Sequence, residues 1–125
     1  MIEAIVFDAY GTLFDVYSVG ALAEQLFPGH GKSLSKLWRD KQIEYTRLRT
    51  MSNMYKPFWE LTEDALIFSC KELGLNCTTN DKDALMDQYS KLPAFKENLE
   101  VLQAMKLTGI KLAILRFVTR VFQED

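Results

Sequence analysis

The sequence predicts an α/β fold in which a short parallel sheet carries a large helical insertion. Two short apolar runs, one near each end of the chain, have the composition of buried strands, whereas the residues between them repeat apolar side chains at helical spacing. A helix followed by a glycine and a strand is typical of a βαβ unit, so we expect the two strands to be parallel neighbours. The chain of 125 residues has room for one domain, or for a small core with an insert.

The first strand is expected over residues 2–7, which end in a β-branched and aromatic run. Asp8 follows at the carboxyl end of this strand and precedes a turn that contains Gly11. Open α/β sheets place their reactive groups at this edge. Asp8 is therefore a candidate nucleophile, because a carboxylate can act in covalent catalysis.

The residues after this turn predict a series of helices. Apolar side chains recur at steps of three and four residues, and glycine, proline or capping residues mark the helix ends. The expected elements are helices 18–26 with Ser18 as N-terminal cap, 33–53, 58–73 closed by Gly74, 81–91 capped by Asn80, and 96–107, and then a strand 110–115 after Gly109. Because the helical block is too long for one crossover, we expect residues 15–92 to form a helical cap inserted into a partial α/β core of residues 1–14 and 93–125.

Composition argues against several classes of function. Lys plus Arg total 15 and Asp plus Glu total 17, and this balance gives no support to a nucleic-acid partner. No apolar run approaches the length that spans a membrane, and the first residues lack the basic segment of a secretory signal. We therefore expect a cytoplasmic protein without membrane partners, in which Cys70 and Cys77 are structural thiols and His30 is a solvated loop residue.

The segment from Phe7 to Asp15, FDAYGTLFD, resembles the first motif of the haloacid dehalogenase superfamily. Tyr10, two residues after the candidate nucleophile, is similar to the L-2-haloacid dehalogenase branch. Residues 37–46, 62–66 and 109–115 resemble the same branch, so the resemblance covers the chain in order up to about Leu115. It implies a haloacid dehalogenase-like Rossmannoid core, of which the chain holds the first two parallel strands, with an inserted all-helical cap.

The resemblance implies hydrolysis of L-2-haloacids to D-2-hydroxyacids through an aspartyl ester on Asp8. Asp8 would displace halide from C2 with inversion, and water would then hydrolyse the ester at its carbonyl carbon. Phosphatases of the superfamily have an acid where this chain has Tyr10, but a departing halide needs no proton. Since the substrate, a small 2-haloalkanoic acid, carries only one charge, we expect neither a metal nor a cofactor.

Arg39 matches the cap arginine of the family, which would face Asp8 and receive the departing halide. A guanidinium offers both charge and hydrogen-bond donors for this task. The alternative is a solvated cation on a basic helix face. Arg39 and Ile43 lie four residues apart and would share one flank of their helix, whereas Trp38 is expected to pack inside the cap.

The remaining candidate residues also follow from the resemblance. Tyr10, Ile43 and Phe58 match positions that line the apolar pocket for the substrate, and Thr12 would hydrogen-bond near the carboxylate of Asp8. Ordinary core packing is the alternative for Ile43 and Phe58, and turn capping is the alternative for Thr12.

The resemblance stops after Leu115. The family continues with a Ser–Asn pair, a later lysine and a later group of Ser, Asn and Asp, whereas residues 116–125 resemble a foreign tail, as a frameshift, a truncated gene or an alternative splice would give. A two-stranded parallel sheet leaves hydrogen-bonding edges open. We therefore expect a C-terminally truncated dehalogenase that is weak or inactive in this form.

Two other functions stay open at this point. The first is a non-catalytic, cap-bearing module that binds a partner, for which a second copy in a homodimer is one candidate. The second is a phosphatase of the same superfamily, against which Tyr10 argues because it replaces an acid. Halide release from L-2-chloropropionate separates the dehalogenase from the module, and hydrolysis of a phosphoester with magnesium would identify the phosphatase.

Overall fold

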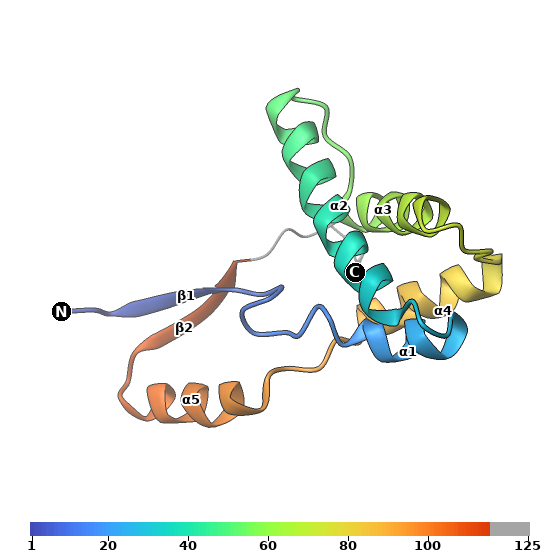
Figure 1. The fold of residues 1–125 in the computed structure, drawn as a ribbon. Coiled ribbons are helices and arrows are strands. Elements are labelled where there is room, and N and C mark those ends of the chain that lie inside the picture. The colour runs from blue at the N-terminus through green and yellow to red at the C-terminus, as the bar shows by residue number, and fades with distance from the viewer. Residues whose placement is uncertain (116–125) are drawn as a thin grey trace, which may run out of the picture.

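The computed structural model describes residues 1–115 and has the mixed α/β architecture that the sequence predicts. In chain order the elements are strand β1 (Ala4–Asp8), helices α1 (Val19–Leu26), α2 (Gly31–Met51), α3 (Phe58–Glu72), α4 (Thr79–Ser90) and α5 (Lys96–Leu107), and strand β2 (Lys111–Leu115). Figure 1 shows that they form two parts. Helices α1–α4 pack together as a helical part, and β1, α5 and β2 form a sheet part beside it.

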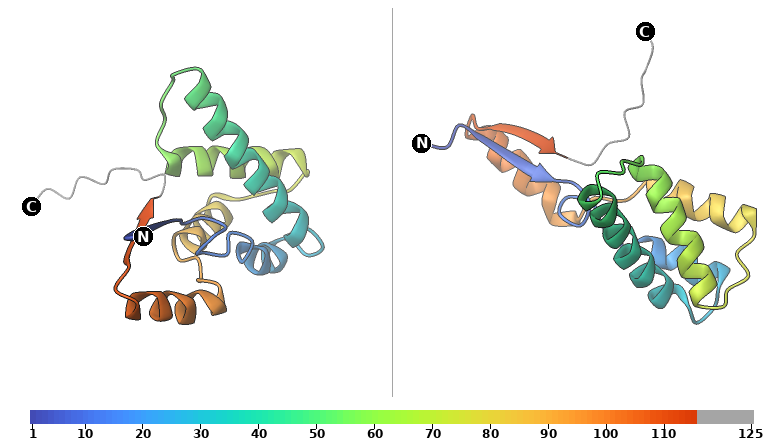
Figure 2. Two further views of the ribbon diagram at one scale, coloured as in Figure 1. Left: turned by 90° about the vertical axis from the view of Figure 1, so that its left-hand side faces the viewer. Right: turned by 90° about the horizontal axis from the view of Figure 1, so that it is seen from above.

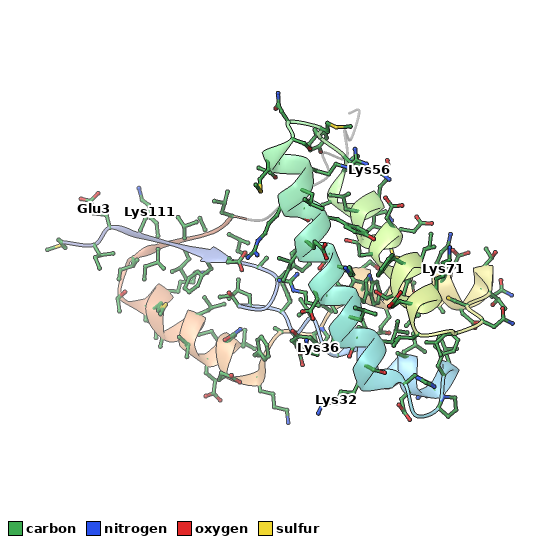
Figure 3. All side chains as sticks on the ribbon, turned by 45° about the horizontal axis from the view of Figure 1, so that its top comes forward. Glu3, Lys32, Lys36, Lys56, Lys71 and Lys111 are labelled. Carbon is green, nitrogen blue, oxygen red and sulfur yellow. The ribbon has the colours of Figure 1, made fainter. Side chains whose placement is uncertain are left out.

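The two strands pair in parallel, as the sequence predicts, with Asp8 opposite Leu115 at the carboxyl end. Helix α5 runs along one face of this sheet (Figure 2). Side chains alternate between the two faces. Phe7 is half-buried, whereas Val6 on the opposite face is 61% exposed. In Figure 3, Glu3 and Lys111 mark the amino end of the sheet, away from the helical part.

The helical part contains the buried core. The long helices that the periodicity predicts over 33–53 and 58–73 are the uninterrupted α2 and α3. Leu34, Leu66 and Leu85, from three different helices, are completely buried. Trp38 packs inside this core, as expected, and its indole N–H donates to the carbonyl of Thr62 at 2.8 Å. All four of these helices fall within residues 15–92, but the division of the chain into cap and core stays a prediction.

The helix ends correct two expectations. Asn80 does not cap its helix, because α4 begins at Thr79 and Thr78 occupies the N-cap position. The hydroxyl of Thr78 accepts from the Asp81 N–H, and the Asp81 carboxylate accepts from the Thr78 N–H, so the two satisfy each other as a capping box. Ser18 does precede α1, but its hydroxyl donates to the carbonyl of Asp15 instead of accepting a capping bond.

Glycines close two of the helices where the sequence places them. Gly74 follows α3 with φ +67°, and Gly109 follows α5 with φ +80°, both in the region that only glycine adopts freely. No helix within residues 1–115 is long and apolar enough to cross a membrane.

Candidate active site between the helical and sheet parts

Asp8 is the last residue of strand β1, whose carboxyl end is directed towards the helical part (Figure 1). The side chain is exposed, and the hydroxyl of Thr12 donates to its Oδ2 at 3.3 Å. Thr12 therefore lies where the sequence places it, next to the nucleophile candidate. Its contact orients the carboxylate without burying it.

A tight turn after β1 fixes the position of Asp8. The amides of Leu13 and Phe14 both donate to the carbonyl of the buried Ala9, and the Gly11 amide donates to the carbonyl of Phe14. Gly11 adopts φ +85°, which a residue with a Cβ rarely accepts. The chain therefore reverses immediately after the strand and leaves Asp8 at its tip.

Helix α5 holds the far side of this turn. The side-chain amide of Asn98 donates to the carbonyls of Thr12 and Leu13, each at 3.0 Å. The amide of Phe95 also donates to the Leu13 carbonyl. These bonds satisfy backbone acceptors that the reversal would otherwise leave unpaired. They also tie the Asp8 turn to the sheet part.

Arg39 reaches this turn from α2. Its Nη2 donates to the carbonyl of Tyr10 at 3.4 Å, and a Cβ placed on Gly11 would lie 3.8 Å from the same nitrogen. The guanidinium is half-buried and lies over the turn, not in bulk water. Because a guanidinium has more donors than these contacts use, Arg39 can also bind an anion.

A buried glutamine holds the other nitrogen of Arg39. Nη1 donates to Oε1 of Gln42 at 2.8 Å, and Gln42 itself is 1% exposed. The Gln42 side-chain amide donates to the hydroxyl of Thr62 at 2.7 Å and contacts the hydroxyl of Tyr89 at 2.9 Å. Burial raises the pKa of Tyr89, so its hydroxyl stays a neutral member of this network. The network joins α2, α3 and α4 and fixes the guanidinium from behind.

An aromatic stack forms one wall of the site. The ring of Tyr10 lies between Phe58 of α3, at 5.3 Å between centroids, and Tyr89 of α4, at 5.8 Å. Such spacings are those of attractive aromatic pairs. Tyr10 thus anchors the segment that follows Asp8 to the helical part.

A cavity of about 310 Å³ is lined by the sequence-predicted site residues with the exception of Thr12. Its lining consists of Asp8, Tyr10, Arg39, Gln42, Ile43, Thr46, Arg47 and Phe58. The lining thus includes one carboxylate residue and two arginines together with aromatic and aliphatic side chains. The size suits a small anion with an alkyl group.

The chain is similar in sequence to several dehalogenases. It is 48% identical to the (S)-2-haloacid dehalogenase of Pseudomonas sp. (strain YL) over 114 residues, which cover 91% of this chain and 49% of that protein. It is 44% identical to haloacetate dehalogenase H-2 of Moraxella sp. (strain B), over 91% of this chain and 51% of that protein. No family model matches the chain.

Solved structures that resemble this chain are also dehalogenases. The L-2-haloacid dehalogenase RSc1362 superposes with a TM-score of 0.91 at 50% identity, over 98% of this chain and 56% of that chain. The relatives and structure neighbours of this chain are thus L-2-haloacid dehalogenases, a branch of the haloacid dehalogenase superfamily. The L-2-haloacid dehalogenase of Xanthobacter autotrophicus, solved with chloropropionic acid covalently bound, superposes with a TM-score of 0.85 at 37% identity, over 96% of this chain and 48% of that chain.

The chain spans about half the length of the relatives that it matches. The tail that the sequence analysis distinguishes, residues 116–125, lies outside the described residues.

The structure adds polar residues that the sequence analysis missed. Gln42 and Tyr89 support Arg39, and Thr46 and Arg47 line the cavity. A signal for Gln42 exists in the sequence, because Leu34, Trp38 and Gln42 follow one another at steps of four and so share the buried face of α2. A glutamine on such a face needs buried partners. For Tyr89 the sequence contains no comparable signal.

Other reactive side chains lie away from this site. Cys70 and Cys77 are free thiols, and burial raises the pKa of Cys70 to about 12. Neither borders the cavity, and a thiol with so high a pKa is a poor nucleophile. Within residues 1–115 no group of His, Cys, Asp and Glu is placed to hold a metal ion.

Proposed function

We propose that this chain carries the nucleophile and the halide-binding arginine of an L-2-haloacid dehalogenase, and that small 2-haloalkanoic acids are its substrates. The observation that carries the proposal is the cavity that Asp8 and Arg39 line together with the apolar side chains of Tyr10, Ile43 and Phe58. The family relationship supports this assignment. The proposed nucleophile has the exposure and the placement at a strand tip that a covalent mechanism needs.

In the first step an oxygen of the Asp8 carboxylate attacks C2 of the haloacid, and the carbon–halogen bond breaks. The halide leaves with the bonding electron pair, and an ester between Asp8 and C2 forms with inversion. In the second step water attacks the ester carbonyl carbon of Asp8, which regenerates the carboxylate and releases a D-2-hydroxyacid and a proton. The Xanthobacter autotrophicus relative solved with chloropropionic acid covalently bound supports a covalent route.

Arg39 stabilises the negative charge that develops on the departing halogen. The charge moves from Asp8 towards the guanidinium during the first step, so a cation fixed at that side favours the transition state over the ground state. Gln42 acts through Arg39 as a positioning residue, because it holds Nη1 and leaves the remaining donors for the anion. A preorganised donor of this kind contributes about 3–4 kcal/mol in well-studied enzymes.

The walls of the cavity exclude water from the alkyl group of the substrate. Tyr10, Ile43 and Phe58 supply the apolar surface, and Thr12 keeps the carboxylate of Asp8 in its attacking orientation. Where the bound alkyl group displaces water, the attraction between the guanidinium and the halide is strengthened. The groups present suit displacement at carbon, and no step requires a proton donor at the halogen.

The proposal is tested by a single-turnover experiment. The chain is incubated with L-2-chloropropionate, released halide is measured, and peptide mass spectrometry locates the ester. We expect an ester on Asp8 and slow turnover at most, because catalytic groups act strongly together and the chain spans half of its relatives. Asp8→Asn should abolish both signals.

Asp15→Asn is the matched control, because this nearby carboxylate accepts from the Tyr17 amide and does not line the cavity. Its ester yield should equal that of the unmodified chain. Halide release that survives in Asp8→Asn, or an ester on a residue other than Asp8, would reject the assignment.

A second candidate function is a non-catalytic module that binds a partner. The exposed apolar side chains of the sheet favour it, including Val6 and Leu115, which are 61% and 73% exposed. Large exposed apolar surfaces commonly mark interaction sites. Absence of any ester on Asp8, together with a stable complex in solution, would favour this module over the enzyme.

A further inference from the structure

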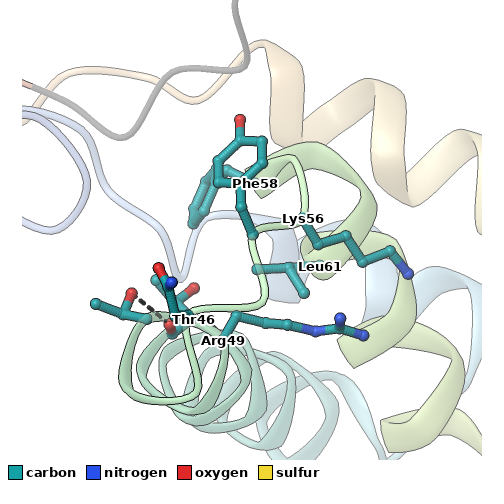
Figure 4. Close-up of a pocket in the computed structure, with 8 residues that line it drawn as sticks. Thr46, Arg49, Lys56, Phe58 and Leu61 are labelled. Atoms are coloured by element: carbon teal, nitrogen blue, oxygen red, sulfur yellow. Dashed lines mark hydrogen bonds between the residues drawn. The ribbon is translucent and has the colours of Figure 1, made fainter.

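A second cavity adjoins the one that contains Asp8. It also measures about 310 Å³ and is lined by Thr46, Arg49, Thr50, Asn53, Tyr55, Lys56, Phe58 and Leu61 (Figure 4). Thr46 and Phe58 line both cavities, so the two meet at these side chains. The second cavity lies along α2 in the direction of its carboxyl end.

The lining of the second cavity suits an anion at the end of an apolar chain. Phe58 and Leu61 provide apolar surface, and Arg49 and Lys56 provide cations. None of the lining residues within 1–115 carries a carboxylate. Figure 4 shows Arg49 and Lys56 extending in the same direction, with Leu61 between them in this view. The cavity is therefore positive and partly apolar.

These two cations differ in their ion pairs within residues 1–115. Lys56 is paired with Asp64 and approaches Glu60 at 4.0 Å. Arg49 is half-buried and forms no ion pair with another residue in the described range 1–115. Asp64 borders a neighbouring cavity together with Arg49, but its carboxylate is held by Lys56. Within residues 1–115 the guanidinium of Arg49 therefore has no ion-pair partner, and the carboxylate of a ligand could become one.

We propose that the second cavity binds the distal carboxylate of longer 2-haloacids, which makes 2-halodicarboxylic acids a substrate class of this site. The inference rests on the proposed function, because it assigns the reactive end of the same molecule to Asp8 and Arg39. Arg39 and Arg49 both belong to α2 and lie about three turns, or about 15 Å, apart along its axis. A flexible diacid passes from one guanidinium to the other along Ile43, Thr46 and Phe58.

The test uses acids that cannot react. The full chain is labelled with ¹⁵N and titrated with succinate, adipate and suberate, and in parallel with the monocarboxylates butyrate, hexanoate and octanoate. Affinity is obtained from the amide shifts in the Asp8 turn and around Arg49. We expect each longer diacid to bind about fivefold more tightly than its monocarboxylate, the size of one partly exposed charge pair, with no such advantage for succinate.

Variants of Arg49 assign this difference to one side chain. Arg49→Gln should remove the diacid advantage and leave the monocarboxylate affinity unchanged, and Arg49→Lys should keep part of it. Lys36→Gln is the matched control, because Lys36 pairs with Asp40 on α2 and borders neither cavity. Equal affinity for diacids and monocarboxylates, or an equal loss in Lys36→Gln, would overturn the inference.

This outcome is separable from that of the proposed function. The unreactive acids report binding alone, so an absent ester on Asp8 leaves the diacid result unchanged. Conversely, ester formation with equal binding of both acid series would retain the proposed function and reject the second cavity as a substrate site.

Discussion

The helical part and the sheet part of this chain differ sharply in how many of their side chains are buried. The helical part buries side chains from all four of its helices. In the sheet part, α5 contains no buried residue, and the open face of the sheet exposes Val6 and Leu115. Since burial of apolar surface is the main source of folding free energy, the stability of the chain must reside in α1–α4.

The two groups proposed to act on the substrate belong to different parts. Asp8 belongs to the weakly supported sheet, and Arg39 belongs to the well-packed helices. Their relative position depends on the Arg39–Tyr10 contact, the Tyr10 ring stack and backbone bonds such as that from the Asp15 amide to the Pro93 carbonyl. The proposed nucleophile Asp8 is thus more easily displaced than Arg39, the proposed halide-binding cation.

The largest effect should come from the core of the helical part. Leu66→Ala deletes a completely buried side chain, and we expect it to lower the free energy of unfolding by about 2–5 kcal/mol. Leu99→Ala on α5 is the matched control, because Leu99 is 63% exposed and its loss should change stability by less than about 0.5 kcal/mol. Urea unfolding followed by circular dichroism measures both, and equal losses would refute the contrast between the two parts.

The second effect concerns the link between the core and the site. Gln42→Leu removes the partner of Arg39, Thr62 and Tyr89, and we expect a loss of about 1–3 kcal/mol in stability because these buried groups are left unpaired. The ester yield on Asp8 should fall as well, since Arg39 loses its fixed orientation. Gln25→Leu on the exposed side of α1 is the control and should leave both quantities unchanged. A stable variant with undiminished ester yield would show that Arg39 needs no support from Gln42.

The third effect tests a local feature of the helical part. Thr78→Ala breaks the capping box of α4 and should reduce stability by about 1 kcal/mol. Asn80→Ala should cost less than about 0.5 kcal/mol, because Asn80 lies inside the first turn and caps nothing. Thermal unfolding of both variants decides the matter. The opposite order of stability would restore Asn80 as the cap.

How well the sequence predicts a feature of the fold depends on how far apart in the sequence the interacting residues lie. Helical periodicity and glycine positions are local, so the course of α2 and α3 and the closure at Gly74 follow directly. Thr78 and Asn80 are both good capping residues two positions apart, and only the reciprocal bonds with Asp81 distinguish them. Boundaries set by such competition are the least predictable from sequence.

The site is predictable to a different degree. The approach of Arg39 to the Asp8 turn joins residues far apart in sequence, and no periodicity contains that information. The expectation came from the family resemblance, and the structure places both side chains on one cavity. Gln42 and Tyr89 were not predicted, because a polar residue in a helix is ordinarily solvated. In the structure, the packing of α2 against α3 and α4 buries both side chains.

The smallest effect leaves stability unchanged and uses the two cysteines as reporters of how tightly the core of the helical part is closed. Burial raises the pKa of Cys70 to about 12, so at pH 8 only roughly one molecule in ten thousand carries the reactive thiolate. Cys77 is only half-buried, and burial raises its pKa as well.

A thiol reagent should therefore modify Cys77 first and Cys70 only slowly. The labelling rate of Cys70 should rise about tenfold per pH unit above pH 8 until the chain unfolds. Mass spectrometry of the labelled peptides gives both rates, and urea should make them equal. Rapid labelling of Cys70 at pH 8 in the absence of urea would mean that the core of the helical part opens readily in the folded chain, which would contradict the stability assigned to α1–α4.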